Sequence, residues 1–163
     1  MSTEILINLL EKILLLHKKL YTLSEQKSEI LKKDDIEALS AHMKDEQQYI
    51  LAIKQLENER IAVVKKLFGD QYIDENAYTL SNVIDHSEEP NKSILSKLQK
   101  EITNTVSELR ERNHLNQQLT NQSLQFVNMT LDMIYPTERN VNYGNPLSNQ
   151  SKKEHRSMFD SKA

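Results

Sequence analysis

Glycine and proline are scarce in this sequence, and that scarcity constrains the fold more than any other feature. The 163 residues include two Gly and three Pro, where average usage would supply about twenty. Residues 1–68 and 91–135 contain neither. Sheet proteins turn tightly after nearly every strand, and those turns depend largely on Gly and Pro. The sequence therefore excludes sandwiches, barrels and doubly wound sheets, and predicts an all-α fold.

The first predicted helix covers residues 3–32. Its apolar residues step by three and four, as in a coiled-coil heptad seam. This seam comprises Leu6, Leu9, Ile13, Leu16, Leu20, Leu23 and Ile30. Further leucines at positions 10, 14, 15 and 31 widen the stripe. We therefore expect this helix to pack against more than one neighbour.

A second helix is predicted for residues 35–68, antiparallel to the first because the connection is short. Asp34 and Glu37 have the spacing of a capping box, and Gly69 stands where a left-handed carboxyl cap belongs. The seam of this helix comprises Ile36, Leu39, Met43, Glu46, Ile50, Ile53, Glu57, Arg60, Val64 and Leu67. Three of these entries are polar, yet we expect this stripe, like the first, to form bundle core.

Residues 69–90 break the pattern and predict a connector, within which Thr79 is placed to cap a short helix. A third long helix is predicted for residues 91–135, after Pro90. Residues 136–163 have no apolar period and are expected to form a flexible tail. The complete prediction is an elongated antiparallel bundle of three long helices with coiled-coil-like seams over residues 1–135, followed by that tail.

The last part of the third helix is apolar around more of its circumference than one seam requires. Its apolar residues are Leu119, Leu124, Phe126, Val127, Met129, Leu131, Met133 and Ile134. Adaptable methionines beside an aromatic ring suit a surface where partner helices dock. The pattern leaves two interpretations open, a client-binding surface and buried core. Asn113 and Asn116 interrupt the seam upstream, and we expect them to set helix register or to bond across the bundle.

Known catalytic and metal-binding patterns are missing from the sequence. Cysteine is absent, which excludes disulfides, thiolate metal sites and cysteine nucleophiles. The five histidines show no zinc-binding spacing, and no G-x-S-x-G turn or Gly-rich phosphate loop can be written. We therefore expect neither an enzyme nor a protein with a metal or other cofactor, and a stoichiometric metal would contradict this.

Charge and hydropathy restrict the partners. Five Lys or Arg and three Asp or Glu follow residue 135, so the net charge of −3 leaves −5 on the first 135 residues. An acidic body with scattered lysines is a poor nucleic-acid surface. No apolar run approaches the 18 or more residues that span a bilayer, and the amino terminus lacks a basic leader. We expect a cytoplasmic protein without membrane insertion or bound nucleic acid.

Four short stretches of the chain stand out together. They are residues 31–39 (LKKDDIEAL), 56–60 (LENER), 113–119 (NHLNQQL), and the pair Tyr143 and Gly144. Together they resemble the FlgN family of flagellar export chaperones. The first resembles the family's linker into its second helix, where relatives often have Gly at the position of Asp34. The second and third are similar to an L-x-x-E-R motif and an N-x-x-N-x-x-L motif. The stretches occur in the family's order along almost the whole chain.

The resemblance implies a non-enzymatic chaperone of the flagellar type III export system. Such a protein would bind the carboxyl-terminal helical segments of the hook-associated proteins FlgK and FlgL. It would prevent their premature assembly and deliver them to the export gate component FlhA. The resemblance assigns gate docking to Tyr143. The alternative is a structural coiled-coil protein that self-associates, as a homodimer through the third-helix stripe, without any client.

Overall fold

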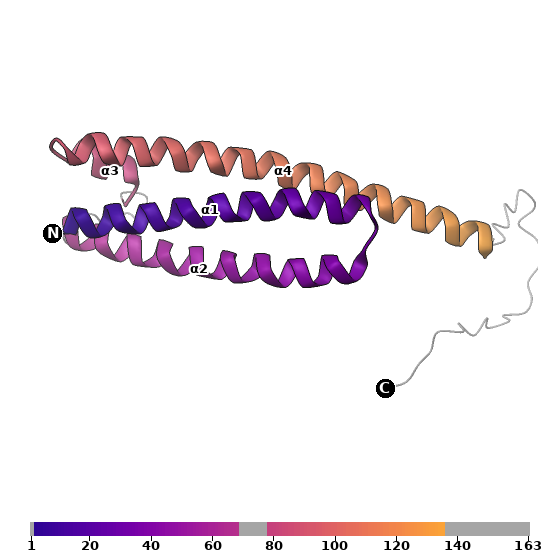
Figure 1. Ribbon diagram of the computed structural model, residues 1–163. Coiled ribbons are helices and arrows are strands. Elements are labelled where there is room, and N and C mark those ends of the chain that lie inside the picture. The colour runs from indigo at the N-terminus through magenta and orange to yellow at the C-terminus, as the bar shows by residue number, and fades with distance from the viewer. Residues whose placement is uncertain (1, 69–77, 136–163) are drawn as a thin grey trace, which may run out of the picture.

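A computed structural model of the chain describes residues 2–68 and 78–135. Four α-helices make up nearly all of this part, and it contains no strand. They are α1 (Ser2–Lys32), α2 (Ile36–Phe68), α3 (Leu80–Asp85) and α4 (Asn91–Ile134) (Figure 1). The all-α prediction with three long helices is confirmed. Gly69, Tyr143 and the predicted tail, residues 136–163, lie outside the described residues.

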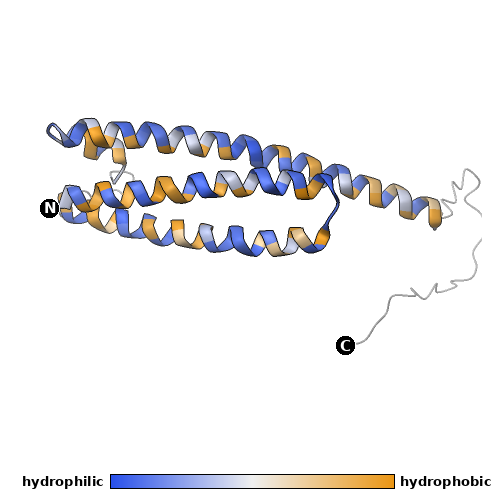
Figure 2. Ribbon diagram, in the orientation of Figure 1, coloured by the Kyte–Doolittle hydropathy of each residue, from blue (hydrophilic) through white to orange (hydrophobic). Residues whose placement is uncertain are grey.

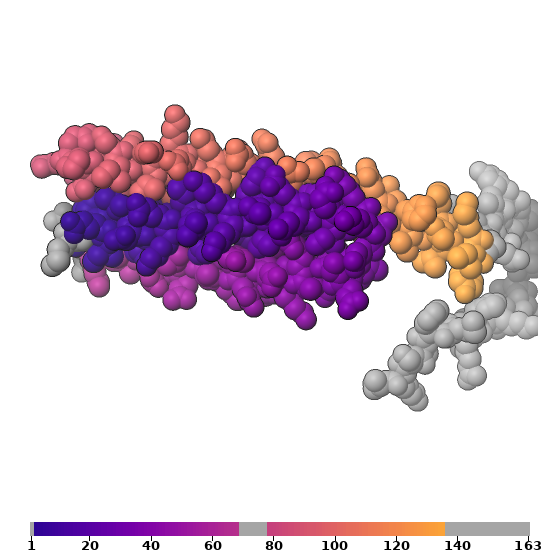
Figure 3. Space-filling view, viewed as in Figure 1, coloured from indigo at the N-terminus to yellow at the C-terminus, as the bar shows by residue number. Residues whose placement is uncertain are grey.

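α1 is the central helix of the assembly, because it packs against both α2 and α4. α2 returns antiparallel to α1 after the short turn, whereas α4 runs parallel to α1 (Figure 1). Two ion pairs show the parallel register, Lys18 with Glu101 and Glu25 with Arg112. On the face displayed in Figure 3, α1 lies between the other two long helices. The widened leucine stripe correctly predicted that this helix has more than one neighbour.

The apolar core is concentrated at one end of the bundle, where α3 packs. It consists of Leu6, Leu10, Leu14, Val64, Val83, Ile84, Leu95 and Leu98, which come from all four helices. Thr79 caps α3 as predicted, since its hydroxyl oxygen accepts a hydrogen bond from the Asn82 amide. Each large buried side chain contributes about 1.5–3 kcal/mol, so this end is the apolar anchor of the fold.

The turn between α1 and α2 corrects the predicted cap. Asp34 has a positive φ of 53° and ends α1 in the left-handed conformation that favours Gly. The amino-terminal cap of α2 is instead Asp35, whose Oδ1 accepts a hydrogen bond from the Ala38 amide at 2.9 Å. The capping-box spacing of Asp34 and Glu37 was therefore one residue out of register. The positive φ also accounts for the Gly that relatives were expected to carry at the position of Asp34.

The seam of α2 is not the core that its spacing predicted. Among its residues only His42 and Val64 are buried, while Ile36, Met43 and Ile50 are more than half exposed. α1 covers one side of α2, and no broad contact joins α2 to α4. Heptad spacing shows which residues share a face, but a face becomes core only where a second helix lies over it. The bundle is consequently open along α2.

Candidate protein-binding site

α4 is longer than the two helices beside it, and its carboxyl end projects alone. α4 has 44 residues, against 31 in α1 and 33 in α2. Ser123 is level with the α1–α2 turn, because its hydroxyl donates a hydrogen bond to Asp34 Oδ1 at 3.0 Å. Residues 124–134 therefore extend past the turn, by about 16 Å at 1.5 Å per residue (Figures 1 and 3). We call this segment the projecting end.

The projecting end is rich in hydrophobic residues (Figure 2), and its large apolar side chains are exposed to solvent. They are Leu124, Phe126, Val127, Met129, Leu131, Met133 and Ile134, and the exposed Tyr135 follows them as the carboxyl cap of α4. Met133 is 74% exposed and Phe126 is 64% exposed. Of the eight residues singled out from the sequence, only Leu119 is partly covered. None of the eight belongs to the core of the single chain, so this exposed apolar patch is a candidate interaction surface.

The apolar residues near the end of α4 form two stripes. The inner stripe lies on the same side of α4 that packs on α1 and continues that side in steps of three and four residues. It comprises Leu124, Val127, Leu131 and Ile134. The outer stripe comprises Leu115, Leu119, Phe126, Met129 and Met133. These residues also follow steps of three and four, with the polar Gln122 at the position between Leu119 and Phe126. Phe126 and Val127 are successive residues and so lie about 100° apart around the helix. The surface can therefore be covered from two sides.

This part of α4 carries no formal charge. Residues 113–131 contain no Asp, Glu, Lys or Arg, and their polar members are Asn, Gln, Ser, Thr and one His. The last cation before this stretch is Arg112, which pairs with Glu25 and lies over the Tyr21 ring. Hydrogen bonding to Tyr21 raises the pKa of the Arg112 guanidinium. A partner on residues 113–131 must therefore be recognised through apolar contact and neutral hydrogen bonds.

A cavity of about 340 Å³ lies where the projecting end leaves the turn. Ile30 and Leu31 of α1, Ile36 and Leu39 of α2, and Leu124, Phe126 and Val127 of α4 supply its apolar lining. All three long helices therefore contribute to one apolar recess at the base of the projecting end. An apolar side chain of a partner could anchor there.

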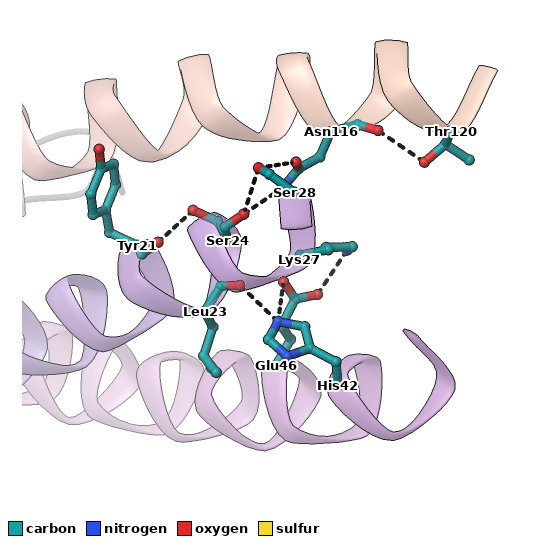
Figure 4. A network of polar contacts seen from close by, with 9 residues as sticks. All are labelled: Tyr21, Leu23, Ser24, Lys27, Ser28, His42, Glu46, Asn116 and Thr120. Carbon is teal, nitrogen blue, oxygen red and sulfur yellow. Dashed lines mark hydrogen bonds and ion pairs between the residues drawn. The ribbon is translucent and has the colours of Figure 1, made fainter. Parts of the chain in front are cut away.

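Asn116 joins α4 to α1 through a buried polar layer (Figure 4). Its side chain is 4% exposed, and its Nδ2 donates to the Ser24 carbonyl oxygen at 2.8 Å. The Ser28 hydroxyl donates to Asn116 Oδ1 at 2.6 Å. The prediction of a bond across the bundle is confirmed for Asn116. Asn113 is exposed instead and lies along the opening between α2 and α4.

A second polar layer joins α1 to α2 beside the first (Figure 4). His42 is 8% exposed and its Nε2 lies 2.7 Å from the Leu23 carbonyl oxygen, so this nitrogen donates. Lys27 Nζ contacts Glu46 Oε2 at 2.8 Å, and both side chains are largely covered. Glu46 Oε1 also lies 3.8 Å from His42 Nε2. In the turn half of the bundle, polar contacts hold the helices together alongside the buried side chains of Leu20 and Leu31.

Residues 56–60 (LENER), one of the stretches that resemble the family, have a structural role at the end of the bundle where α3 packs. Arg60 donates through Nε and Nη2 to Glu57 Oε1, at 2.8 and 2.6 Å. Its Nη1 donates to the Tyr78 carbonyl oxygen at 3.1 Å. Arg60 therefore holds the segment leading into α3 against α2, far from the projecting end.

The sequence interpretation missed the exposed stripe of α2. Ile36, Met43 and Ile50 were assigned to core, although polar Glu46 and Glu57 interrupt the same seam. Those interruptions were the available signal, because Asp and Glu are seldom buried unless they are paired, and Glu46 is covered only together with its partner Lys27. Tyr135, 69% exposed at the tip of α4, was also left out of the predicted surface.

The described residues offer no sign of a different kind of site. Within residues 2–68 and 78–135, no group of three or more His, Cys, Asp or Glu side chains is arranged to hold a metal ion. None of the helices described has the length and apolar character needed to cross a membrane.

Comparisons with known proteins identify the family of the chain. The family model described as "FlgN protein" matches residues 1–150. The "Uncharacterized protein YvyG" of Bacillus subtilis (strain 168) is 35% identical over 164 residues, covering 100% of each chain. No solved structure matches. Because the family match covers most of the chain, and a full-length relative supports it, the chain belongs to the FlgN family.

Proposed function

We propose that this chain is a cytoplasmic flagellar export chaperone for the hook-associated proteins FlgK and FlgL. FlgN is a chaperone family rather than an enzyme family, so membership supports the export-chaperone role in general. The observation that carries the specific proposal is the projecting end of α4, which is apolar, uncharged over most of its length and exposed. The clients would be bound through the helical segments at their carboxyl ends.

The proposed binding mode is a helix docked on a helix. An amphipathic client helix would place residues spaced i, i+3, i+4 and i+7 against the projecting end. The contact residues proposed are Leu119, Leu124, Phe126, Val127, Met129, Leu131, Met133 and Ile134. Burying one large apolar side chain is worth about 1.5–3 kcal/mol, so four or five anchors offset the several kcal/mol lost on association. Micromolar or tighter affinity needs no further chemistry.

Binding of this kind would also delay assembly. The helical ends of a filament-type protein assemble through their own apolar faces, and a chaperone that covers such a face leaves none for premature contact. Delivery would then require the export gate component FlhA to bind the complex. Tyr143, which lies outside the described residues, is the residue proposed for that docking.

The test is a charge placed in the inner stripe. We expect Val127→Asp to weaken binding of a FlgK carboxyl-terminal peptide at least tenfold in isothermal titration, because the anchor loses its apolar contact and a carboxylate is desolvated. The helical circular dichroism should stay unchanged, since Val127 is half exposed. Leu15→Asp is the matched control, because Leu15 is 54% exposed on α1, away from the projecting end.

Two results would contradict the proposal. Equal affinity of the Val127→Asp and unsubstituted proteins would place the client elsewhere. A stable dimer in sedimentation, unaffected by the peptide and lost in the Val127→Asp variant, would favour the alternative of self-association. The alternative has a physical basis, because residues 113–131 carry no charge that would repel a second copy.

A further inference from the structure

We propose that the open groove between α2 and α4 is a second part of the client site, occupied by the same amphipathic helix that docks on the projecting end. This inference rests on the proposed chaperone function and extends it. It gives a role to exposed apolar residues of α2, which belong neither to the apolar core nor to the projecting end. The partner helix would then be the fourth helix of a bundle in which α1, α2 and α4 are the first three.

The groove is a continuous feature of the described structure. A cavity of about 380 Å³ opens between α2 and α4 over α1. Leu20 and Lys27 form its floor, Glu46 and Ile50 form one wall, and Leu109, Asn113, Asn116, Gln117 and Thr120 form the other. Thr120 also lines the apolar recess at the base of the projecting end. The groove and the inner stripe therefore meet at Thr120 and Leu124.

The wall on α2 carries an apolar stripe without a partner. Ile36, Met43 and Ile50 recur at intervals of seven residues, which places them on one side of the helix. They are 80%, 52% and 54% exposed. Ile36 lines the recess and Ile50 lines the groove, so this stripe faces the same opening as the inner stripe. One long helix would cover both stripes.

The occupant follows from continuity with the contacts already present. The side of α4 that packs on α1 runs on, in steps of three and four, into Leu124, Val127, Leu131 and Ile134. A helix docked on that stripe meets the end of α1 at the turn and can continue beside it along the groove, which adjoins the recess at Thr120. From Leu109 to Ile134, α4 spans about 38 Å, so a client segment of about 25 helical residues matches the site.

The groove also indicates what the client helix carries. Its charged residues, Lys27 and Glu46, already pair with each other at 2.8 Å. The α4 wall offers the neutral side chains of Asn113 and Gln117, which are exposed. A charged residue buried against this wall would lose hydration without gaining an opposite charge. The matching helix therefore has apolar anchors over the inner stripe and an uncharged polar residue opposite Asn113 and Gln117.

Thiol protection can test the groove directly, because the chain has no cysteine of its own. Single variants Ile50→Cys, Val127→Cys and Leu51→Cys each carry one thiol to react with a maleimide. Leu51 is the matched control, since it is 58% exposed, adjoins Ile50 and lines neither cavity. The probe is a FlgK carboxyl-terminal peptide of at least about 25 residues, the helical length that matches the site, added at saturation.

We expect the peptide to slow modification at positions 50 and 127 at least tenfold and to leave position 51 unchanged. Protection at 127 without protection at 50 would overturn the groove inference and leave the proposed function standing. Protection at neither position would contradict both. Protection at 50 that appears without peptide and rises with protein concentration would assign the groove to a second copy of this chain, and would also overturn the inference.

Discussion

Asn116 shows how one polar residue fixes the register between two helices of this bundle. It bonds to Ser24 and Ser28 of α1, at 2.8 and 2.6 Å, in a layer whose three side chains are all buried. A sliding of α4 along α1 would leave the Asn116 amide buried without partners, which costs about 1–3 kcal/mol, whereas the Ser28 hydroxyl would keep its hydrogen bond to the Ser24 carbonyl oxygen. The register between α1 and α4 places Ser123 beside Asp34 and so fixes the point at which α4 begins to project.

The matched pair of Asn116→Ala and Asn113→Ala tests this role. Asn116→Ala should lower the free energy of unfolding by about 1–3 kcal/mol, because buried hydrogen bonds are lost. Asn113→Ala should change it by less than about 0.5 kcal/mol, because that side chain is exposed. Urea unfolding followed by circular dichroism measures both. Equal effects of the two substitutions would show that the buried layer does not set the stability.

The sequence was sufficient to predict which helices exist and in which direction they run. It was not sufficient to predict which helix faces are covered by a neighbouring helix. The leucines that widen the α1 stripe correctly predicted two neighbours, because Leu10 and Leu14 are buried in the core that α1 shares with the other helices. The α2 seam was misjudged, since spacing alone does not say whether a helix lies over Met43 or Ile50. The length of α4 could be read from Pro90 and Pro136. Its register against α1 could not, so whether its last part was core or surface stayed open.

The uncharged stretch of α4 leads to a prediction about salt. If the client binds residues 113–131 through apolar and neutral polar contacts, its dissociation constant should change less than about threefold between 50 and 500 mM NaCl, since screening acts on charges. Titration of the FlgK peptide at several salt concentrations measures this. A steep weakening with salt would instead place the main contact on the charged surfaces of α1 or α2.

The molecule as a whole has two unequal halves. One end joins all four helices through eight buried apolar side chains, whereas the turn end is held by the layers around Asn116 and His42. Local opening is easiest where few apolar contacts must break. The less stable end also holds the recess, the groove and the base of the projecting end. The proposed client would therefore bind where the bundle is most adaptable.

Hydrogen exchange tests this asymmetry and its link to function. In the free protein, amides of residues 6–14 should exchange about tenfold or more slowly than those of residues 39–50, because the former are anchored by core leucines. Adding the FlgK peptide should slow exchange in residues 39–50 and leave residues 6–14 nearly unchanged. Uniform exchange in the free protein would contradict the two-part description. If the peptide slowed amide exchange only in residues 119–134, the client would be restricted to the projecting end. A helix bound in the groove would also reduce the local opening of α2 and slow the exchange of its amides.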